Sequence, residues 1–513
     1  MRKIILLSFI WLFTYNQSVA QKYDYRWILG YIGNPALTGN TDLVFNDSSA
    51  DTINSHRNIT MQNSQTTISD SAGNLLFFSN GARIYNRNNN TMQNGDSLNF
   101  GAEWTEYYQG SAFNELEEMV GLPTDTSELW NLIHYYVEYN PNTTPYFYTW
   151  RIEETKVDMR EDIGLGGVAF KNKILVQDTL GTYVTACQHA NGRDWWVLAS
   201  QVSTNCLYTL LVEPDTVIQY PMQCLGKNYA DNDGGQAAFA PNGTKFAWLG
   251  AYGGINIYDF DRCTGLLSNA DSLPFYWTPF VSLQSGISFS PDSRFLYVAQ
   301  QLYILQFDLQ STNIAASVDT VGRLTAPPDS NSLRGYYFLM QLAPDGKIYV
   351  SANNGIKYLH VINNPDKKGD SCNFVNYGFP LCYNNSFGLP SYPGNYRLGP
   401  LHGSPCDTIY KTDTTGTDTT GVGIRALREK ILKIYPNPAS DYAIVDYGFT
   451  DWSMGTHVSM EITDAIGQVI YTQQLPMYSG FQKLDVSKFA PGLYNVMIKR
   501  SGAVIAITKL IKQ

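Results

Sequence analysis

A turn motif that recurs along the middle of this chain restricts the fold more than any other feature of the sequence. Each copy reads as a strand, a Pro-Asp/Asn-Gly/Ser turn and a second strand. Proline presets φ and glycine accepts a positive φ, so each copy encodes a β-hairpin locally. Three copies are clear and three are looser: Phe239–Trp248, Phe289–Tyr297 and Leu342–Tyr349, then Ile68–Phe78, Leu122–Trp130 and His189–Trp196.

The spacing of these turns predicts a β-propeller. Successive turn positions are 54, 65, 51, 50 and 53 residues apart, and a further strand usually follows each hairpin. Three or four strands in about 50 residues fit one propeller blade. A β-sandwich would show closer turns, and no long 3.6-residue periodicity suggests a helical solenoid. The six turn positions are Gly73, Ser127, Gly192, Gly243, Ser293 and Gly346.

The blade number follows from the repeat length. The first and last of the six turns are 273 residues apart, which gives five intervals of about 55 residues each. The 385 residues from 22 to 406 then hold seven units of that length. Six blades is the alternative. We expect the seventh blade to combine N-terminal strands at Arg26–Tyr31 and Asp42–Phe45 with a C-terminal strand near Asn395–Leu398, which would close the ring without free edges.

The N-terminus has the three parts of a secretory signal peptide, predicted over residues 1–20. Arg2 and Lys3 precede an apolar stretch, and small residues, Ser18 and Ala20, precede a cut before Gln21. The stretch is shorter than the roughly 20 residues that span a bilayer. We therefore expect an exported mature chain with no transmembrane segment, in a compartment that permits disulfides.

The last quarter of the sequence predicts a tether and a small domain. Residues 407–424 contain Asp-Thr-Thr-Gly-Thr-Asp-Thr-Thr-Gly, a composition typical of a flexible linker. Residues 425–513 then alternate short strands with Asn-Pro, Ala-Ile-Gly and Pro-Gly turns, which predicts a β-sandwich.

Motifs in this tail resemble the type A C-terminal sorting domain of the Bacteroidetes type IX secretion system. The resemblance implies export to the periplasm, passage across the outer membrane, removal of the domain, and then release or attachment to surface lipopolysaccharide. The machinery of that system would be the partner of the tail. The matching residues are Tyr435, Pro436, Asn437, Pro438, Gly467, Gly492, Tyr494, Lys509 and Lys512.

The repeat region has a resemblance of its own. Its Phe-Ser-Pro-Asp-Gly-like turns resemble the WD-repeat-like propeller superfamily, which implies a fold and almost nothing about function. Three strings also resemble a group of exported Bacteroidetes propellers: His189–Trp196, Asp259–Gly265 and Leu359–Pro365.

One disulfide is predicted from strand geometry. Cys206–Val212 and Val217–Cys224 read as the two strands of a hairpin, which sets Cys206 opposite Cys224 within bridging range. Two separate buried thiols are the alternative. The chain has seven cysteines, so at least one is left free or pairs between molecules, and none lies in a CxxC pair of the kind that binds zinc.

The charge balance excludes some partners. Loss of Arg2 and Lys3 takes the formal charge from −10 to −12, and only 16% of residues are charged. An acidic surface of this kind argues against nucleic acid and against docking on anionic lipid through a basic patch.

Candidate chemistry is sparse, and we expect no cofactor. His189, Arg193, Asp194 and Trp195 could form a binding cluster, although a buried junction between blades explains the same residues. Asp231 and Asp233 resemble a fragment of a calcium loop without its bidentate glutamate, so a loop without metal is the preferred interpretation. No Gly-x-Ser-x-Gly elbow or phosphate-binding glycine loop is present, and no catalytic residue is assigned.

Two functions remain open. The first is a surface binding or adhesion module that recognises a glycan or a protein through loops such as 86–94 and 383–396. The alternative is an exported hydrolase or lyase that acts on polysaccharide or peptide. Carboxylates about 5 to 10 Å apart in the axial mouth would favour the enzyme, and an aromatic mouth without them would favour binding.

Overall fold

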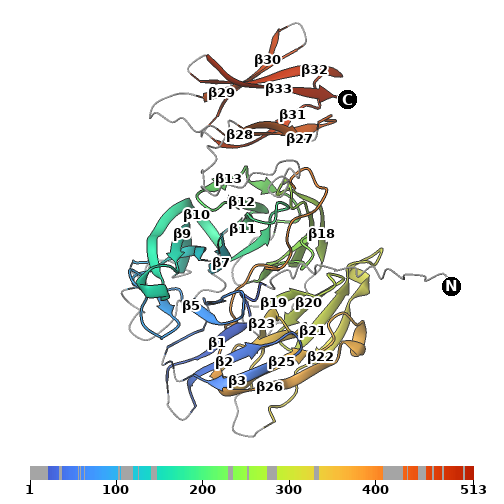
Figure 1. Ribbon diagram of the computed structural model, residues 1–513. Coiled ribbons are helices and arrows are strands. Elements are labelled where there is room, and N and C mark those ends of the chain that lie inside the picture. The colour runs from blue at the N-terminus through green and yellow to red at the C-terminus, as the bar shows by residue number, and fades with distance from the viewer. Residues whose placement is uncertain are drawn as a thin grey trace, which may run out of the picture.

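A computed structural model gives the fold of the chain (Figure 1). The described residues are 21–33, 37–55, 57, 59–62, 64–101, 104, 119–124, 126, 128–139, 147–228, 235–250, 254–273, 286–328, 334–407, 431–435, 437–448, 458–464, 467–475, 479–500 and 503–513. The predicted signal peptide (residues 1–20) and residues 408–430 of the predicted linker and tail lie outside them.

The region before the linker folds as a β-propeller, as predicted, with seven blade-like units of antiparallel strands (Figure 1). Three short 3-10 turns accompany them, Asp162–Gly164, Ala315–Ser317 and Gly369–Cys372. Blades 1 and 2 are β1 (Arg26–Tyr31), β2 (Gly39–Phe45), β3 (Ala50–Asn54) and β4 (Thr66–Ser69), β5 (Leu75–Ser79), β6 (Ile84–Asn86). Blade 5 is made of β15 (Ala237–Phe239), β16 (Lys245–Gly250), β17 (Gly254–Phe260) and β18 (Leu267–Leu273). Blade 6 is made of β19 (Gly286–Phe289), β20 (Phe295–Gln300), β21 (Tyr303–Asp308) and β22 (Asp319–Arg323). Blade 7 is made of β23 (Tyr337–Leu342), β24 (Ile348–Ala352), β25 (Ile356–Ile362) and β26 (Phe374–Asn385).

One long strand joins blades 3 and 4 into a single eight-stranded sheet. The first part of β10 (Gly167–Gln188) pairs with β9, and its last part, up to Gln188, pairs with β11. The 22-residue strand thus serves as the outer strand of blade 3 and the inner strand of blade 4. The remaining strands are β7 (Met119–Pro123), β8 (Leu129–Tyr139), β9 (Phe147–Asp158), β11 (Trp195–Gln201), β12 (Cys206–Val212), β13 (Val217–Gln219) and β14 (Gln223–Cys224).

The recurring turns have the backbone conformation that their residues predict. Gly243 and Gly346 have φ of +71° and +78°, where a glycine carries no Cβ penalty. Ser293 adopts φ +63° at the equivalent position of blade 6. Its hydroxyl accepts a hydrogen bond from the Asn242 amide of blade 5 at 3.1 Å, so the side chain that strains this turn also joins two blades.

The ring closes differently from the prediction. No strand forms at Asn395–Leu398, and blade 1 keeps only its three N-terminal strands. The seam between blades 7 and 1 is instead made largely through side chains, since the Thr41 hydroxyl accepts the Cys382 amide at 3.1 Å and the Asn385 side chain accepts the Gly30 amide at 3.1 Å. One backbone bond, from the Asn384 amide to the Leu37 carbonyl at 3.0 Å, also crosses it. Proline lacks an N–H, and the nearby Pro393 and Pro400 leave the predicted strand poorly suited to a ladder.

The tail forms a small two-sheet β-domain. One sheet has the order β27-β28-β31 and the other the order β30-β29-β32-β33, and apolar side chains of both sheets form one core. The strands are β27 (Ile431–Tyr435), β28 (Tyr442–Gly448), β29 (Val458–Thr463), β30 (Val469–Leu475), β31 (Ser479–Asp485), β32 (Gly492–Arg500) and β33 (Ala503–Lys512).

Candidate functional site

The axis of the propeller is occupied by the chain itself. After β26, residues 386–400, here called the axial segment, run between the inner strands of the blades. Three of its large side chains, Leu389, Tyr392 and Tyr396, are buried in the same core as the innermost strands. The loop 383–396 was predicted to present aromatic side chains to a ligand. That prediction is wrong for Tyr392 and Tyr396, because their rings pack inside the ring of blades.

Hydrogen bonds tie the axial segment to six of the seven blades. The single O–H of Tyr392 is shared between backbone carbonyls of blade 1, at 3.0 Å, and blade 2, at 2.9 Å, and the Tyr396 hydroxyl donates to blade 3 at 2.6 Å. The Gly394 amide reaches blade 4 at 3.0 Å and the Asn395 side chain reaches blade 5 at 2.9 Å. The Phe387 amide bonds to blade 7 at 2.8 Å. The segment therefore bonds to backbone carbonyls of inner strands in blades 1 to 4, of a turn in blade 5 and of the second strand in blade 7.

A buried arginine and a disulfide fix the end of the axial segment. Arg262 donates to the carbonyls of Gln188 at 2.8 Å and His189 at 3.2 Å, and also to that of Gly399. Six residues beyond Pro400, Cys406 is bonded to Cys263, which is next to Arg262. Sequence reasoning missed this pairing because 143 residues separate the two cysteines.

The predicted binding cluster lies in this same junction. The Asp194 carboxylate accepts from Arg193 at 2.6 Å, and His189 faces the Cys263 carbonyl across 3.1 Å. Trp195 is buried, with its ring centroid 5.8 Å from that of Tyr396. The structure thus brings the four residues together, but their polar groups bond to one another or to backbone and His189, Asp194 and Trp195 are buried. Their placement agrees with the interpretation of the cluster as a buried junction between blades.

A cavity remains beside the axial segment at one end of the axis. It has a volume of about 220 Å³ and opens among the Pro-Asp/Asn turns of blades 5, 6 and 7. We call the end of the propeller that carries these turns the turn face. The turn prolines Pro241, Pro291 and Pro344 line the cavity together with Leu342 and Tyr392. The repeated turns therefore furnish a rigid mouth whose surface is part apolar and part polar.

One ion pair borders this mouth. Arg397 donates to Asp24 at 2.8 Å, and its guanidinium lies 5.1 Å from the ring centroid of Tyr25. Burial raises the pKa of Asp24, although the Arg397 charge opposes this effect. Asp24 is the one carboxylate among the described residues that line the cavity.

The histidines of the propeller core do not form a reactive site. Burial lowers the pKa of His134 to about 4 and of His360 to about 3, and it also lowers the pKa of His189. These imidazoles are neutral at physiological pH. Among the described residues no group of three or more His, Cys, Asp or Glu side chains could hold a metal ion, and Asp231 and Asp233 lie outside those residues.

The buried histidines predict that acid destabilises the protein. As the pH falls below 6.5, the unfolded state binds protons that the folded state excludes, so stability is fully present above pH 6.5 and declines on acidification. For His134 the difference between 6.5 and about 4 corresponds to about 3 kcal/mol. Urea unfolding at pH 7 and pH 5 should show about 2 kcal/mol of this loss, because the remainder appears only as the pH approaches 4, and His134→Gln should reduce it. An equal loss in the variant would contradict the assignment.

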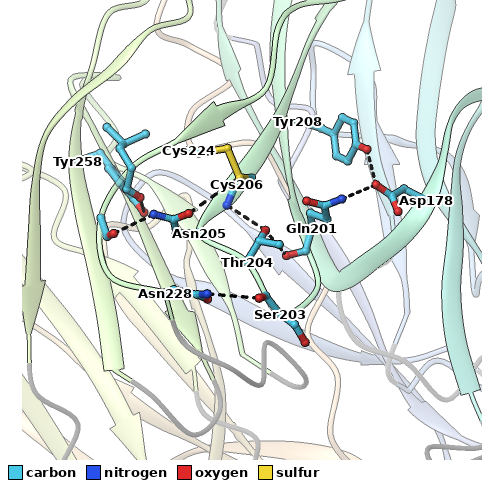
Figure 2. The surroundings of a disulfide bond; sticks show 12 residues. Asp178, Gln201, Ser203, Thr204, Asn205, Cys206, Tyr208, Cys224, Asn228 and Tyr258 are labelled. Carbon is cyan, nitrogen blue, oxygen red and sulfur yellow. Dashed lines mark hydrogen bonds between the residues drawn. A yellow bond between two sulfur atoms is a disulfide. The ribbon is translucent and has the colours of Figure 1, made fainter.

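Cys206 and Cys224 form the disulfide that the hairpin predicts (Figure 2). They face each other in the register of β12 and β14, at a Cα–Cα distance of 4.0 Å. The flanking turn is held by side chains, since the Thr204 hydroxyl donates to the Gln201 carbonyl at 3.0 Å and accepts from the Cys206 amide at 3.1 Å. Of the remaining cysteines, Cys187 and Cys372 are buried and Cys382 is half-buried.

The tail motifs meet at one edge of the terminal domain. The Asn437 side chain donates to the Lys509 carbonyl at 2.7 Å and accepts from the Ile511 amide at 2.8 Å. The Asn-Pro start and the Lys-Leu-Ile-Lys end of the domain are thereby joined. Gly467 has φ +88° in a tight turn, and the buried Tyr494 donates to the Ala490 carbonyl at 2.7 Å next to Gly492. A backbone bridge joins Lys512 to Ala439. Ala20, Pro436 and the side chain of Tyr435 are not among the residues that the structure describes.

Comparison with known protein families gives a match for the terminal domain of the chain. Residues 433–513 match the family model described as a secretion system C-terminal sorting domain. No curated protein matches the chain.

Solved structures that resemble the chain do so at low identity. A protein from Bacteroides fragilis named as a candidate 6-phosphogluconolactonase is 11% identical, covers 72% of this chain and 99% of its own length, and has a TM-score of 0.41. A similarly named Bacteroides uniformis protein is 14% identical, with 70% and 98% coverage and a TM-score of 0.40. The periplasmic gluconolactonase of Pseudomonas aeruginosa is 11% identical, with 72% and 99% coverage and a TM-score of 0.40. Similarity at this level transfers no activity to this chain.

The molecule is an all-β protein in which a plugged β-propeller precedes a small β-domain of the type IX sorting class. It is secreted or displayed on the cell surface, and its tail engages the type IX secretion machinery. The helices of the described part include none long and apolar enough to cross a membrane.

Proposed function

We propose that the propeller is an extracellular binding module whose ligand, a glycan or a protein segment, docks at the turn-face mouth. The observation that carries this proposal is the cavity of about 220 Å³ between the axial segment and the turns of blades 5 to 7. Binding sites of this kind are concave, mostly apolar, and carry a few placed polar groups.

The lining offers both kinds of surface, with polar groups contributing about as much of it as apolar ones. Proline rings and Leu342 supply rigid apolar surface, and Tyr392 borders the cavity although its ring is buried in the core. Asp24, Gln341 and Arg397 supply polar groups at its border. A sugar ring or an apolar peptide side chain could pack on the prolines while its polar edge bonds to these groups.

The mouth is poorly equipped for carboxylate catalysis. Glycosidases place two carboxyl groups about 5 to 10 Å apart. Among the described lining residues Asp24 has no carboxylate partner, and it is already paired with Arg397. The hydrolase or lyase alternative therefore has no support from this cavity.

The experiment is glycan- and protein-array binding by the chain without its predicted signal peptide, residues 21–513, beside a panel of hydrolase substrates. We expect a ligand without turnover. Leu342→Trp, which fills the mouth, should weaken that binding at least tenfold, and Val375→Trp on the exposed outer strand β26 should leave it unchanged. Turnover of a polymer, or equal binding by both variants, would contradict the proposal.

A further inference from the structure

The turn-face mouth contains one accessible cation. Among the described residues that line the cavity, Asp24 and Arg397 are the only charged ones. They form an ion pair, but 36% of the Arg397 side chain is exposed and only 17% of the Asp24 side chain. A ligand that enters the cavity therefore meets the guanidinium more readily than the carboxylate.

Arg397 has hydrogen-bond donors to spare. A guanidinium carries five N–H groups. Nε donates to the Gln21 carbonyl at 3.2 Å and Nη2 to Asp24 at 2.8 Å, and Nη1 makes no hydrogen bond with the described residues. These two bonds and the contact with the Tyr25 ring hold the plane of the group. The outer edge, formed by Nη1 and the second N–H of Nη2, matches the two oxygens of a carboxylate.

The other polar side chains of the mouth are already bonded within the protein. The Gln341 amide donates to the Leu342 carbonyl at 3.0 Å, and the Asn395 amide donates to the Pro241 carbonyl at 2.9 Å. Tyr392 is the one aromatic residue in the described lining, and its ring is buried. A sugar presents hydroxyls around its ring, and each one that loses water without gaining a partner costs free energy. The lining therefore favours a ligand with a single anionic group over a sugar.

The size of the cavity limits its occupant further. Its volume of about 220 Å³ is smaller than the roughly 300–1,000 Å³ of sites that enclose drug-sized ligands. One side chain with its own backbone carboxylate fits such a space better than an oligomer does. Three turn prolines and Leu342 offer the hydrocarbon surface on which an apolar side chain would be buried.

We propose that the mouth binds the free C-terminus of another protein, with the α-carboxylate on Arg397 and an apolar last side chain among the turn prolines. This inference rests on the proposed binding function and names the ligand of that site. A chain end combines, within a few atoms, the anion and the hydrocarbon group that the mouth is equipped to hold. Capture of a terminal carboxylate is also a recurring mode of peptide recognition.

The test compares two peptide libraries of random sequence, one with free C-terminal carboxylates and one with C-terminal amides, for binding to residues 21–513. We expect the first library to yield peptides that end in an apolar residue. Amidated versions of these peptides should bind at least tenfold more weakly, because an amide offers Arg397 no charge. This comparison changes only the peptide, so a folding defect of the protein cannot produce the result.

Three variants then locate the contact. Arg397→Gln should weaken binding of the selected peptide at least tenfold, and Asp24→Asn should strengthen it, because a negative charge beside the ligand carboxylate is removed. Arg323→Gln is the matched control and should bind normally. Arg323 is exposed on β22, away from the described lining of the mouth, and its guanidinium also lies 5.1 Å from the ring centroid of a tyrosine, Tyr303.

Equal binding of the carboxylate and amide peptides would overturn this inference. So would the absence of any binding peptide, capture of acidic sugars alone, or a loss with Asp24→Asn as large as that with Arg397→Gln. If Leu342→Trp still weakens binding of a different ligand, only the identity of the ligand is wrong and the mouth remains a binding site. If no ligand responds to Leu342→Trp, the proposed function fails as well.

Discussion

A chain that stops at Asn385 should fail to hold its propeller closed. Such a truncation removes Leu389, Tyr392 and Tyr396 from the centre of the ring and leaves inner-strand carbonyls without donors. Loss of a buried leucine or aromatic side chain costs roughly 2–5 kcal/mol each, which sums to about 10 kcal/mol. Since domains are stable by about 5–15 kcal/mol, the truncated propeller should be largely unfolded at 25 °C.

Circular dichroism in the near ultraviolet and urea titration of residues 21–385 against residues 21–406 would measure this effect. Cys263→Ser with Cys406→Ser is the intermediate variant, because it keeps the axial segment and removes only the covalent link. Closure of a 143-residue loop contributes up to about 5 kcal/mol to stability in the chain-entropy model. An unfolding midpoint that is the same with and without residues 386–406 would show that the axial segment is not what closes the ring.

Deletion of residues 425–513 should abolish surface display while the propeller stays folded. The terminal domain has its own core, and the family match places the sorting function within residues 433–513. We expect the truncated protein in the periplasm, with the unfolding midpoint of the mature propeller. Protease shaving of intact cells and fractionation measure the distribution, and surface display equal to that of the full chain would contradict it.

The sequence predicted those parts of the fold that are encoded locally. The Pro-Asp-Gly-type turns specify hairpins through two or three residues, so the blades could be derived before any coordinates, with seven preferred and six left as the alternative. The same holds for the bridge between Cys206 and Cys224, which one hairpin brings together. The sorting domain was identified from short motifs in a fixed order.

The axial segment could not be predicted, because its conformation depends on the finished ring. Its Pro- and Gly-rich run with two tyrosines has no strand periodicity and resembles an exposed recognition loop in composition. Only the inner strands, assembled from residues far apart, supply the carbonyls that Tyr392 and Tyr396 reach. For the same reason Arg262 was missed, and the His189–Trp195 cluster was interpretable either as a ligand site or as the junction that the structure shows.

The bond between Cys263 and Cys406 also determines on which side of the ring the propeller ends. Cys263 lies in the β17–β18 turn, on the same side of the ring as the proline turns, so Cys406 is held on that side as well. The flexible linker predicted for residues 407–424 therefore begins on the turn face, so a bulky group attached close to Cys406 would lie on the same side of the ring as the mouth.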